Sequence, residues 1–326
     1  MPRKETAATR SAARAGPDAR ANQGIARVLV LADGRKEDVH ALLVRLEPWL
    51  APKVESLEVE RDARGFYRAR SEAAGKEGAP DLVVVLGGDG AILGAVRAFA
   101  DNPVPTIGIN FGRVGFLAAA ESSHWEEVLG EILAGKAVVE PRSRLIAELE
   151  TAEGAPVRAV ALNDVVLTRG AYQGLLEIAL SIGEEWVTNY RADGLIVSTA
   201  SGSTAYSLAA GGPILAPTMQ DLVLTPISPQ SLSHRTILLP GSSELRLAIT
   251  SASGITTLVV DGQGFYPMQQ GDQVRLRMHP DPYPLLARPG EDFFKRLRER
   301  LGWRGSLEGD AFQPGAPREI DASGGL

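Results

Sequence analysis

The sequence predicts an α/β domain followed by a domain built of β-strands. Over residues 27–117, short apolar runs alternate with helical segments, which is typical of a doubly wound parallel sheet. From residue 138 onward, short runs rich in Val, Ile, Leu and Thr are separated by Gly, Pro and Asn, as in all-β domains. We therefore expect an N-terminal doubly wound parallel α/β domain and a C-terminal domain that resembles a β-sandwich.

The apolar spacing places the elements of the first domain in order. We expect strands at residues 27–32, 54–59, 82–86 and 104–109, and helices at residues 36–50 and 91–100. Residues 60–80 are polar and indicate a loop or a weak helix. One further helix should end near residue 134, and an amphipathic helix should span residues 292–301.

Composition divides the chain into two domains and two tails. Residues 1–24 and 304–326 are predicted to be disordered tails, although the Arg-rich first tail also has a faint likeness to a transit peptide. Residues 25–118 form the predicted α/β domain, and a C-terminal segment, residues 287–303, joins it. Residues 119–286 form the predicted β-rich domain.

Charge and composition exclude several classes of function. A net charge of −6 argues against a protein that binds nucleic acid through its phosphates. The chain has no cysteine, which excludes disulfides and thiolate metal sites, and its four histidines lack metal-ligand spacing. No apolar stretch reaches the roughly 18 to 20 residues of a membrane span. We expect a cytoplasmic protein without a nucleic acid or membrane partner and without a metal site of its own.

The strongest local signal is the turn Gly-Gly-Asp-Gly at residues 87–90. It follows a uniformly apolar strand, so it should lie at the carboxyl edge of the sheet, where α/β proteins bind ligands. Glycines allow phosphate or sugar oxygens to approach backbone N–H groups, and Asp89 would face such a ligand. A tight connection without function is the alternative. Leu93 occupies the third glycine position of the dinucleotide fingerprint, and no Walker A lysine follows.

A second candidate is the hydroxyl-rich segment at residues 198–207, in which six of ten residues are Ser or Thr. Ser203 or Thr204 can cap a small-residue helix at about residues 203–211, and the start of such a helix favours an anion. A single cap explains one hydroxyl group. The remaining ones indicate a binding loop.

Two shorter motifs are ambiguous on their own. Asn163 and Asp164 stand side by side in a strand, and because Asn and Asp are normally exposed, the pair alone indicates a surface position. Asp261 and Gly262 follow another strand, which is most often a hairpin turn.

In this order the motifs resemble those of the NAD kinase family, over about residues 27–303. The shared motifs are Gly87-Gly88-Asp89-Gly90, Gly108-Ile109-Asn110, Gly115-Phe116-Leu117, Asn163-Asp164, residues 193–213, Pro226-Ile227 and Asp261-Gly262-Gln263. The glycine turn also occurs in lipid kinases and phosphofructokinases. The stretch at residues 193–213 is the specific part of the resemblance.

The resemblance implies an enzyme that transfers the γ-phosphoryl group of ATP to the 2′-hydroxyl of the adenosine ribose of NAD, giving NADP. It implies Mg²⁺ or another divalent cation, a homodimer or homotetramer, and an NAD-binding role for residues 119–286. Asp89 would be the essential carboxylate, either as the base for the hydroxyl or as a ligand of Mg²⁺.

The resemblance also implies a set of substrate-contacting residues, in which Arg191 and Asp193 complete a site partly across a subunit interface. The set is Gly87, Gly88, Gly90, Asn110, Phe111, Asn163, Asp164, Arg191, Asp193, Ser201, Thr204, Ala205, Tyr206, Ser207, Leu208, Ala209 and Gln263.

The sequence departs from the family pattern at a few positions. Ala91 stands where Thr is usual, Ala200-Ser201 replaces Pro-Thr, Asp164 replaces Glu, and Gln230 replaces a frequent His. Asp is shorter than Glu, which affects the predicted contact with NAD. Two alternatives stay open, a lipid or sphingoid-base kinase and a non-catalytic NAD-binding regulator. The acidic charge and the hydroxyl-rich loop argue against the first, and Asp89 argues against the second.

Overall fold

The computed structural model describes residues 24–71, 80–112, 115–151, 154, 156–170, 174–252, 254–288 and 293–303. The two predicted tails lie outside the described residues, apart from Gly24. The described residues up to 288 belong to one compact unit, and residues 293–303 belong to a second one. The second unit contributes helix α7 (Phe293–Leu301), where the amphipathic helix was predicted.

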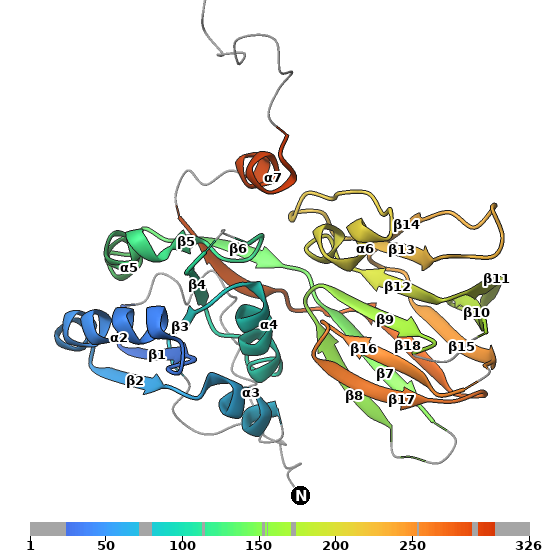
Figure 1. Ribbon diagram of the computed structural model, residues 1–326, viewed down its shortest axis with the longest axis horizontal. Helices are drawn as coiled ribbons and strands as arrows, with labels where there is room; N and C mark the ends of the chain where they lie inside the picture. Colours follow the sequence, from blue (N-terminus) through green and yellow to red (C-terminus); the bar gives the residue numbers. More distant parts are fainter. Residues whose placement is uncertain are drawn as a thin grey trace, which may run out of the picture. The chain divides into compact units, whose positions relative to one another are not determined.

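Within the described residues, the first sheet has seven strands in the order β2-β1-β3-β4-β19-β6, with β5 paired to β4 (Figure 1). The strands are β1 (Arg27–Ala32), β2 (Ser56–Glu60), β3 (Leu82–Leu86), β4 (Thr106–Asn110), β5 (Ala120–Glu121), β6 (Val138–Arg142) and β19 (Tyr283–Ala287). All pair in parallel except β6, which runs antiparallel to β19. The predicted parallel sheet is confirmed.

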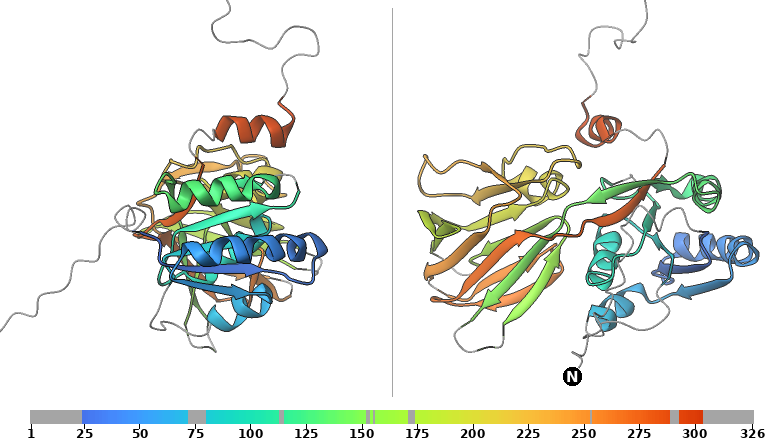
Figure 2. Two further views of the ribbon diagram at one scale, coloured as in Figure 1. Left: turned by 90° about the vertical axis from the view of Figure 1, so that its left-hand side faces the viewer. Right: turned by 180° about the vertical axis from the view of Figure 1, so that it is seen from behind.

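Helices cover both faces of this sheet, as Figure 2 shows. They are α2 (Glu37–Leu50), α3 (Ala63–Ser71), α4 (Asp89–Ala98) and α5 (Trp125–Leu133). Val84 of β3 packs in a core with α2 and α5, whereas its neighbours Val83 and Val85 pack in a core with α3 and α4. Successive strand residues point to opposite faces, so β3 must be apolar throughout.

The rest of the first unit is a pair of antiparallel sheets that share one core. One sheet has the order β11-β10-β15-β18-β7-β8, and the other has the order β14-β13-β12-β9-β16-β17. Their bounds are β7 (Leu145–Glu150), β8 (Val157–Ala161), β9 (Asp164–Thr168), β10 (Leu176–Ile182), β11 (Glu185–Ala192), β12 (Gly194–Ser198), β13 (Asp221–Ile227), β14 (Ile237–Pro240), β15 (Leu245–Ser251), β16 (Thr256–Val260), β17 (Gly264–Met268) and β18 (Gln273–Met278). The predicted β-sandwich-like architecture is confirmed.

Strands β5, β6 and β19 lie in the first sheet although their residues fall within or beside the segment predicted to be the β-rich domain. The division of the chain at residue 118 stays a prediction. The polar segment at residues 60–80 was expected to be a loop or a weak helix. Its part from Ala63 to Ser71 is the helix α3. None of the helices in the described ranges has the length and apolar character that crossing a membrane requires.

Candidate functional site

The glycine turn lies where β3 ends and α4 begins. The helix starts at Asp89, two residues earlier than predicted, so the carboxylate belongs to its first turn. Gly87 is required here, because a Cβ on it would lie 2.8 Å from the Cβ of Ala91. At the neighbouring strand end, the Asn110 amide oxygen would lie 3.4 Å from a Cβ on Gly88. The turn and Asn110 therefore meet at one edge of the sheet, while Phe111 packs against the core that contains α2 and α5.

Three backbone amides hold the Asp89 carboxylate. Phe116 N–H donates to Oδ2 at 2.9 Å, and the N–H groups of Leu117 and Ala118 donate to Oδ1 at 3.2 and 3.3 Å. Gly115 makes room for this arrangement, because a Cβ there would lie 1.8 Å from Asp89 Oδ1. An ionised carboxylate offers about four lone pairs, so about one is left for a ligand.

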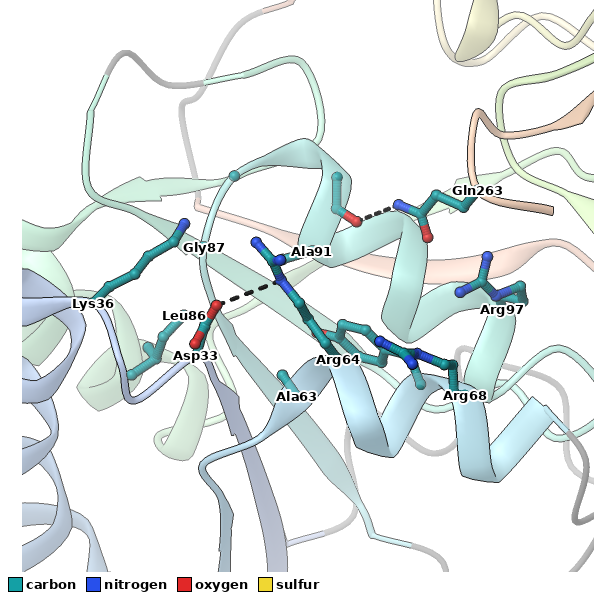
Figure 3. Close-up of a pocket in the computed structure, with 13 residues that line it drawn as sticks. Asp33, Lys36, Ala63, Arg64, Arg68, Leu86, Gly87, Ala91, Arg97 and Gln263 are labelled. Carbon is teal, nitrogen blue, oxygen red and sulfur yellow. Dashed lines mark hydrogen bonds and ion pairs between the residues drawn. The ribbon is translucent and has the colours of Figure 1, made fainter. Parts of the chain in front are cut away.

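A cavity of about 630 Å³ opens beside the glycine turn (Figure 3). Basic side chains from three elements surround it: Lys36 before α2, Arg64 and Arg68 on α3, and Arg97 on α4. These four residues were missed in the sequence. Arg64 and Arg68 have i,i+4 spacing, which puts them on one helix face, but the segment was interpreted as a loop or weak helix.

Asp33, at the end of β1, is the carboxylate that lines this cavity. Arg35 binds it through Nε at 2.7 Å and Nη2 at 2.9 Å. Arg64 Nε lies 3.5 Å from the same carboxylate, as the dashed line in Figure 3 shows. The hydrogen bonds from Arg35, followed by the charge of Arg64, hold the pKa of Asp33 below its usual value. Asp33 therefore stays charged and offsets part of the positive charge of the cavity.

Gln263 reaches the glycine turn from the second half of the molecule. It follows the turn of the β16–β17 hairpin, where Asp261 and Gly262 have φ values of 50° and 64°. The hairpin interpretation of Asp261-Gly262 is therefore confirmed. Gln263 Nε2 donates to the Gly90 carbonyl at 2.6 Å, a contact that Figure 3 shows as a dashed line.

Asp164 is buried, so the surface interpretation was wrong for this residue. It is the first residue of β9, is 5% exposed, and its carboxylate accepts a hydrogen bond from the Tyr206 backbone N–H. Burial, followed by the negative charge of Asp261, raises the pKa of Asp164 to about 7. The neighbouring Asn163 is half-buried, and its side-chain oxygen has no hydrogen-bond partner within the described residues.

The predicted helix caps in the hydroxyl-rich loop were wrong. Ser203 Oγ donates to Ala200 O at 2.6 Å, and Thr204 Oγ1 donates to Ser201 O at 3.1 Å, so both hydroxyls bond to nearby carbonyls. The expected helix is split into a 3₁₀ turn (Gly202–Thr204) and the short helix α6 (Tyr206–Ala209), neither with a side-chain cap.

The same loop nevertheless packs against the backbone of Leu162 and Asn163. Thr199 Oγ1 donates to Leu162 O at 2.6 Å, and a Cβ on Gly202 would lie 2.0 Å from Asn163 O. Ser201 and Ala205 are at least partly buried, as are Thr204 and Leu208, whereas Tyr206 and Ala209 are exposed. Ser207 is turned inward and bonds to Thr225, with 2.9 Å between the two hydroxyl oxygens.

Asp193 immediately precedes β12, at the end of that strand far from Asp164, and Arg191 lies in β11. Ser198 pairs with Asp164, and Asp193 lies five residues before Ser198, so β12 separates Asp193 from Asp164 by about 16 Å along the strand. Asp193 binds Arg169 Nε at 2.7 Å, and Arg191 lies 3.8 Å from Glu177. A single chain does not bring this pair to Asp164.

The titration of Asp164 predicts a stability change with pH. Its pKa in the folded protein lies above the usual 3.8, so the folded state binds the additional proton. The contribution to the free energy of unfolding is complete below about pH 4 and is lost as pH rises through about 7. Between pH 5 and pH 8, the wild type should therefore lose stability relative to Asp164→Asn. Urea unfolding of both proteins at pH 5 and pH 8 measures this difference in the free energy of unfolding. An equal change of the free energy in the two proteins would contradict the prediction.

Comparison with known proteins agrees with this geometry. Residues 49–137 match the family model of the ATP-NAD kinase N-terminal domain, and residues 162–287 match that of the ATP-NAD kinase C-terminal domain. An NAD kinase of Saccharophagus degradans is 42% identical over 224 residues, which is 68% of this chain and 76% of that protein.

Two solved structures are similar over most of the chain. Yeast NADH kinase complexed with NADH has a TM-score of 0.74 and 26% identity, covering 88% of this chain and 90% of that one. An NAD kinase from Archaeoglobus fulgidus in complex with ATP has a TM-score of 0.63 and 26% identity, covering 85% and 97%.

Proposed function

The chain belongs to the NAD kinase family, and we propose that Asp89 is the base of its reaction. That reaction transfers the γ-phosphoryl group of ATP to the 2′-hydroxyl of the adenosine ribose of NAD and yields NADP. The relatives favour neither a lipid kinase nor a non-catalytic regulator. The cytoplasm, which supplies both ATP and NAD, is the proposed location.

The observation that carries this proposal is the amide cradle around Asp89. Three N–H donors fix the position of the carboxylate, and about one lone pair is left over. This free lone pair is enough for Asp89 to accept the single proton of the 2′-hydroxyl. As the 2′-oxygen bonds to the γ-phosphorus, the bond from that phosphorus to the bridging oxygen breaks, ADP leaves, and the hydroxyl proton passes to Asp89.

We assign the acceptor NAD to the side formed by Asn163, Asp164 and the loop at residues 199–209. Asp164 can accept a hydrogen bond from a ribose hydroxyl, and the unpartnered Asn163 oxygen can accept another. Tyr206, 48% exposed, offers an aromatic face to a base or nicotinamide ring. Gln263 would contact the ligand from the hairpin side.

We assign the ATP phosphates to the basic cavity. Lys36, Arg64, Arg68 and Arg97 supply positive charge, and the glycines at positions 87, 88 and 90 expose backbone to the phosphates. In the described ranges, no group of three or more His, Cys, Asp or Glu side chains is placed to hold a metal. Asp33 and Asp89 are the carboxylates that would face Mg²⁺ brought in by the nucleotide, and the ion would neutralise phosphate charge there.

Arg64→Gln should raise the KM for ATP by about 10-fold, the scale of one charge-assisted hydrogen bond, and leave the KM for NAD within about 2-fold. Steady-state kinetics with each substrate varied in turn measures both constants. Arg45→Gln is the matched control, because its side chain is 67% exposed against 66% for Arg64 and also pairs with an acid, Glu126. Equal KM values for ATP in the wild type and in Arg64→Gln would show that Arg64 does not bind ATP.

We further propose a homodimer or homotetramer in which Arg191 and Asp193 of one subunit serve the site of another. The separation of Asp193 from Asp164 along β12 supports this assignment. Light scattering of the purified protein gives the mass in solution, and a monomer at assay concentration that is fully active would contradict the proposal.

The function itself is tested by incubating the purified protein with NAD, ATP and Mg²⁺ and coupling NADP to an NADP-specific dehydrogenase. Formation of NADP that requires all three components is expected. Phosphorus NMR of the product should place the new phosphate on the 2′ position. A protein that folds but forms no NADP would contradict the assignment.

A further inference from the structure

We propose that Asp261 is a positioning residue that sets the acceptor turn, residues 162–164, against the glycine turn of the catalytic carboxylate. The inference rests on the proposed function, because it takes the acceptor turn to be the NAD side of the site. Asp261 lies at the tip of the β16–β17 hairpin, a two-residue turn between Val260 and Gln263.

The Asp261 carboxylate is bonded to three consecutive backbone amides of the acceptor turn. Leu162 N–H donates to Oδ2 at 2.8 Å, and the N–H groups of Asn163 and Asp164 donate to Oδ1 at 2.8 and 3.1 Å. The Asp261 N–H returns a bond to Asp164 O at 3.0 Å. Four hydrogen bonds from one residue thus fix the chain that carries the side chains of Asn163 and Asp164.

The backbone of Asp261 explains how its side chain reaches this turn. With φ at 50°, it adopts the left-handed conformation that non-glycine residues rarely occupy, and Asp and Asn tolerate it best. Gly262, with φ at 64°, completes a turn that reverses the chain in two residues. Positive φ at both positions is what such a two-residue turn requires, so the turn itself holds Asp261 in this conformation.

The same hairpin tip also contacts the glycine turn. Gln263 Nε2 donates to the Gly90 carbonyl at 2.6 Å, one residue from Asp89 (Figure 3). Asp261 and Gln263 are two residues apart, so the hairpin links the acceptor turn to the catalytic turn over a very short path. A rigid tip of this kind fixes the distance between the ribose hydroxyl and the Asp89 carboxylate.

The charge of Asp261 acts on Asp164 as well. Both carboxylates are buried, and burial raises the pKa of each. The charged groups that act on the pair are the two carboxylates themselves and Arg97 of α4, while backbone N–H groups oppose the shifts. Removing the Asp261 charge should therefore lower the pKa of Asp164, so that Asp164 accepts a hydrogen bond from NAD at lower pH.

Asp261→Asn tests the proposal, because Asn tolerates the same φ but cannot accept from all three amides with an NH₂ group in place of one oxygen. We expect the Kd for NAD, measured by calorimetry, and the KM for NAD to rise at least about 10-fold, with the KM for ATP within about 2-fold. The pH midpoint of NAD binding should move to lower pH. Asp261→Gly, which also adopts this φ freely, should raise the Kd similarly if the Asn variant does not fold.

Asp272→Asn is the matched control. Asp272 is 2% exposed and its carboxylate accepts the Gln269 N–H at 2.9 Å in another turn of the β-sheets. Loss of thermal stability in the Asp261 variants, with unchanged NAD affinity and pH midpoint, would show a purely structural role and overturn the proposal. The calorimetric Kd separates the two assignments, because it reports on Asp261 even if the wild type forms no NADP.

Discussion

Replacement of Asp89 with Asn is expected to lower kcat for NADP formation by at least about 10²-fold, the usual scale for removal of a general base. Asn keeps the size of the side chain but cannot take the 2′-hydroxyl proton, and its NH₂ group faces amide donors in the cradle. The KM values should change little, because the contacts assigned to NAD and ATP lie on other residues. The coupled assay at saturating substrates measures kcat.

Asp81→Asn serves as its control. Asp81 precedes β3, as Asp89 follows it, and its carboxylate also accepts backbone amides, those of Ala26 at 3.1 Å and Arg27 at 2.8 Å. It lies at the opposite edge of the sheet, so kcat should stay near that of the wild type. An Asp89→Asn enzyme with kcat within about 3-fold of the wild type would contradict the role of Asp89 as a base.

Gly115→Ala is expected to be nearly as damaging, although the residue carries no functional group. The added Cβ would lie 1.8 Å from Asp89 Oδ1, so either the carboxylate or the segment that binds it must move. Displacing the carboxylate by about 1 Å can cost about 10²-fold in kcat. Steady-state kinetics checks this, with circular dichroism to show that the sheet is intact.

Gly112→Ala is the control for that variant, because a Cβ on Gly112 meets nothing within 4 Å in the same connection. The double variant Asp89→Asn/Gly115→Ala should be about as active as Asp89→Asn, since both changes disable one unit. Additive losses, or a Gly115→Ala enzyme with wild-type kcat, would mean that the cradle does not matter for catalysis.

The parts that could be predicted from sequence are those set by local pattern. Strand β3 is apolar at every position because helices cover both its faces, and this makes such a strand easy to recognise. The glycine turn after it could be placed at the sheet edge for the same reason. The hairpin at Asp261-Gly262 was likewise predictable, because its turn chemistry is local.

The parts that could not be predicted depend on contacts between distant segments. Burial of Asp164 follows from its packing beside Asp261, almost a hundred positions along the chain, and no local pattern records that. The basic cavity combines side chains from before α2, from α3 and from α4. In the hydroxyl-rich loop, the capping rule failed because Ser203 and Thr204 bond to carbonyls of the preceding turn instead.

Two roles for Asp89 were open from the sequence, base and Mg²⁺ ligand, and a titration of Mg²⁺ against wild type and Asp89→Asn distinguishes them most directly. If Asp89 takes the proton, the variant should show a much lower kcat at every Mg²⁺ concentration, with half-saturation at the same concentration as the wild type. A large rise in the half-saturating concentration, or recovery of kcat at high Mg²⁺, would contradict the account and make Asp89 a metal ligand.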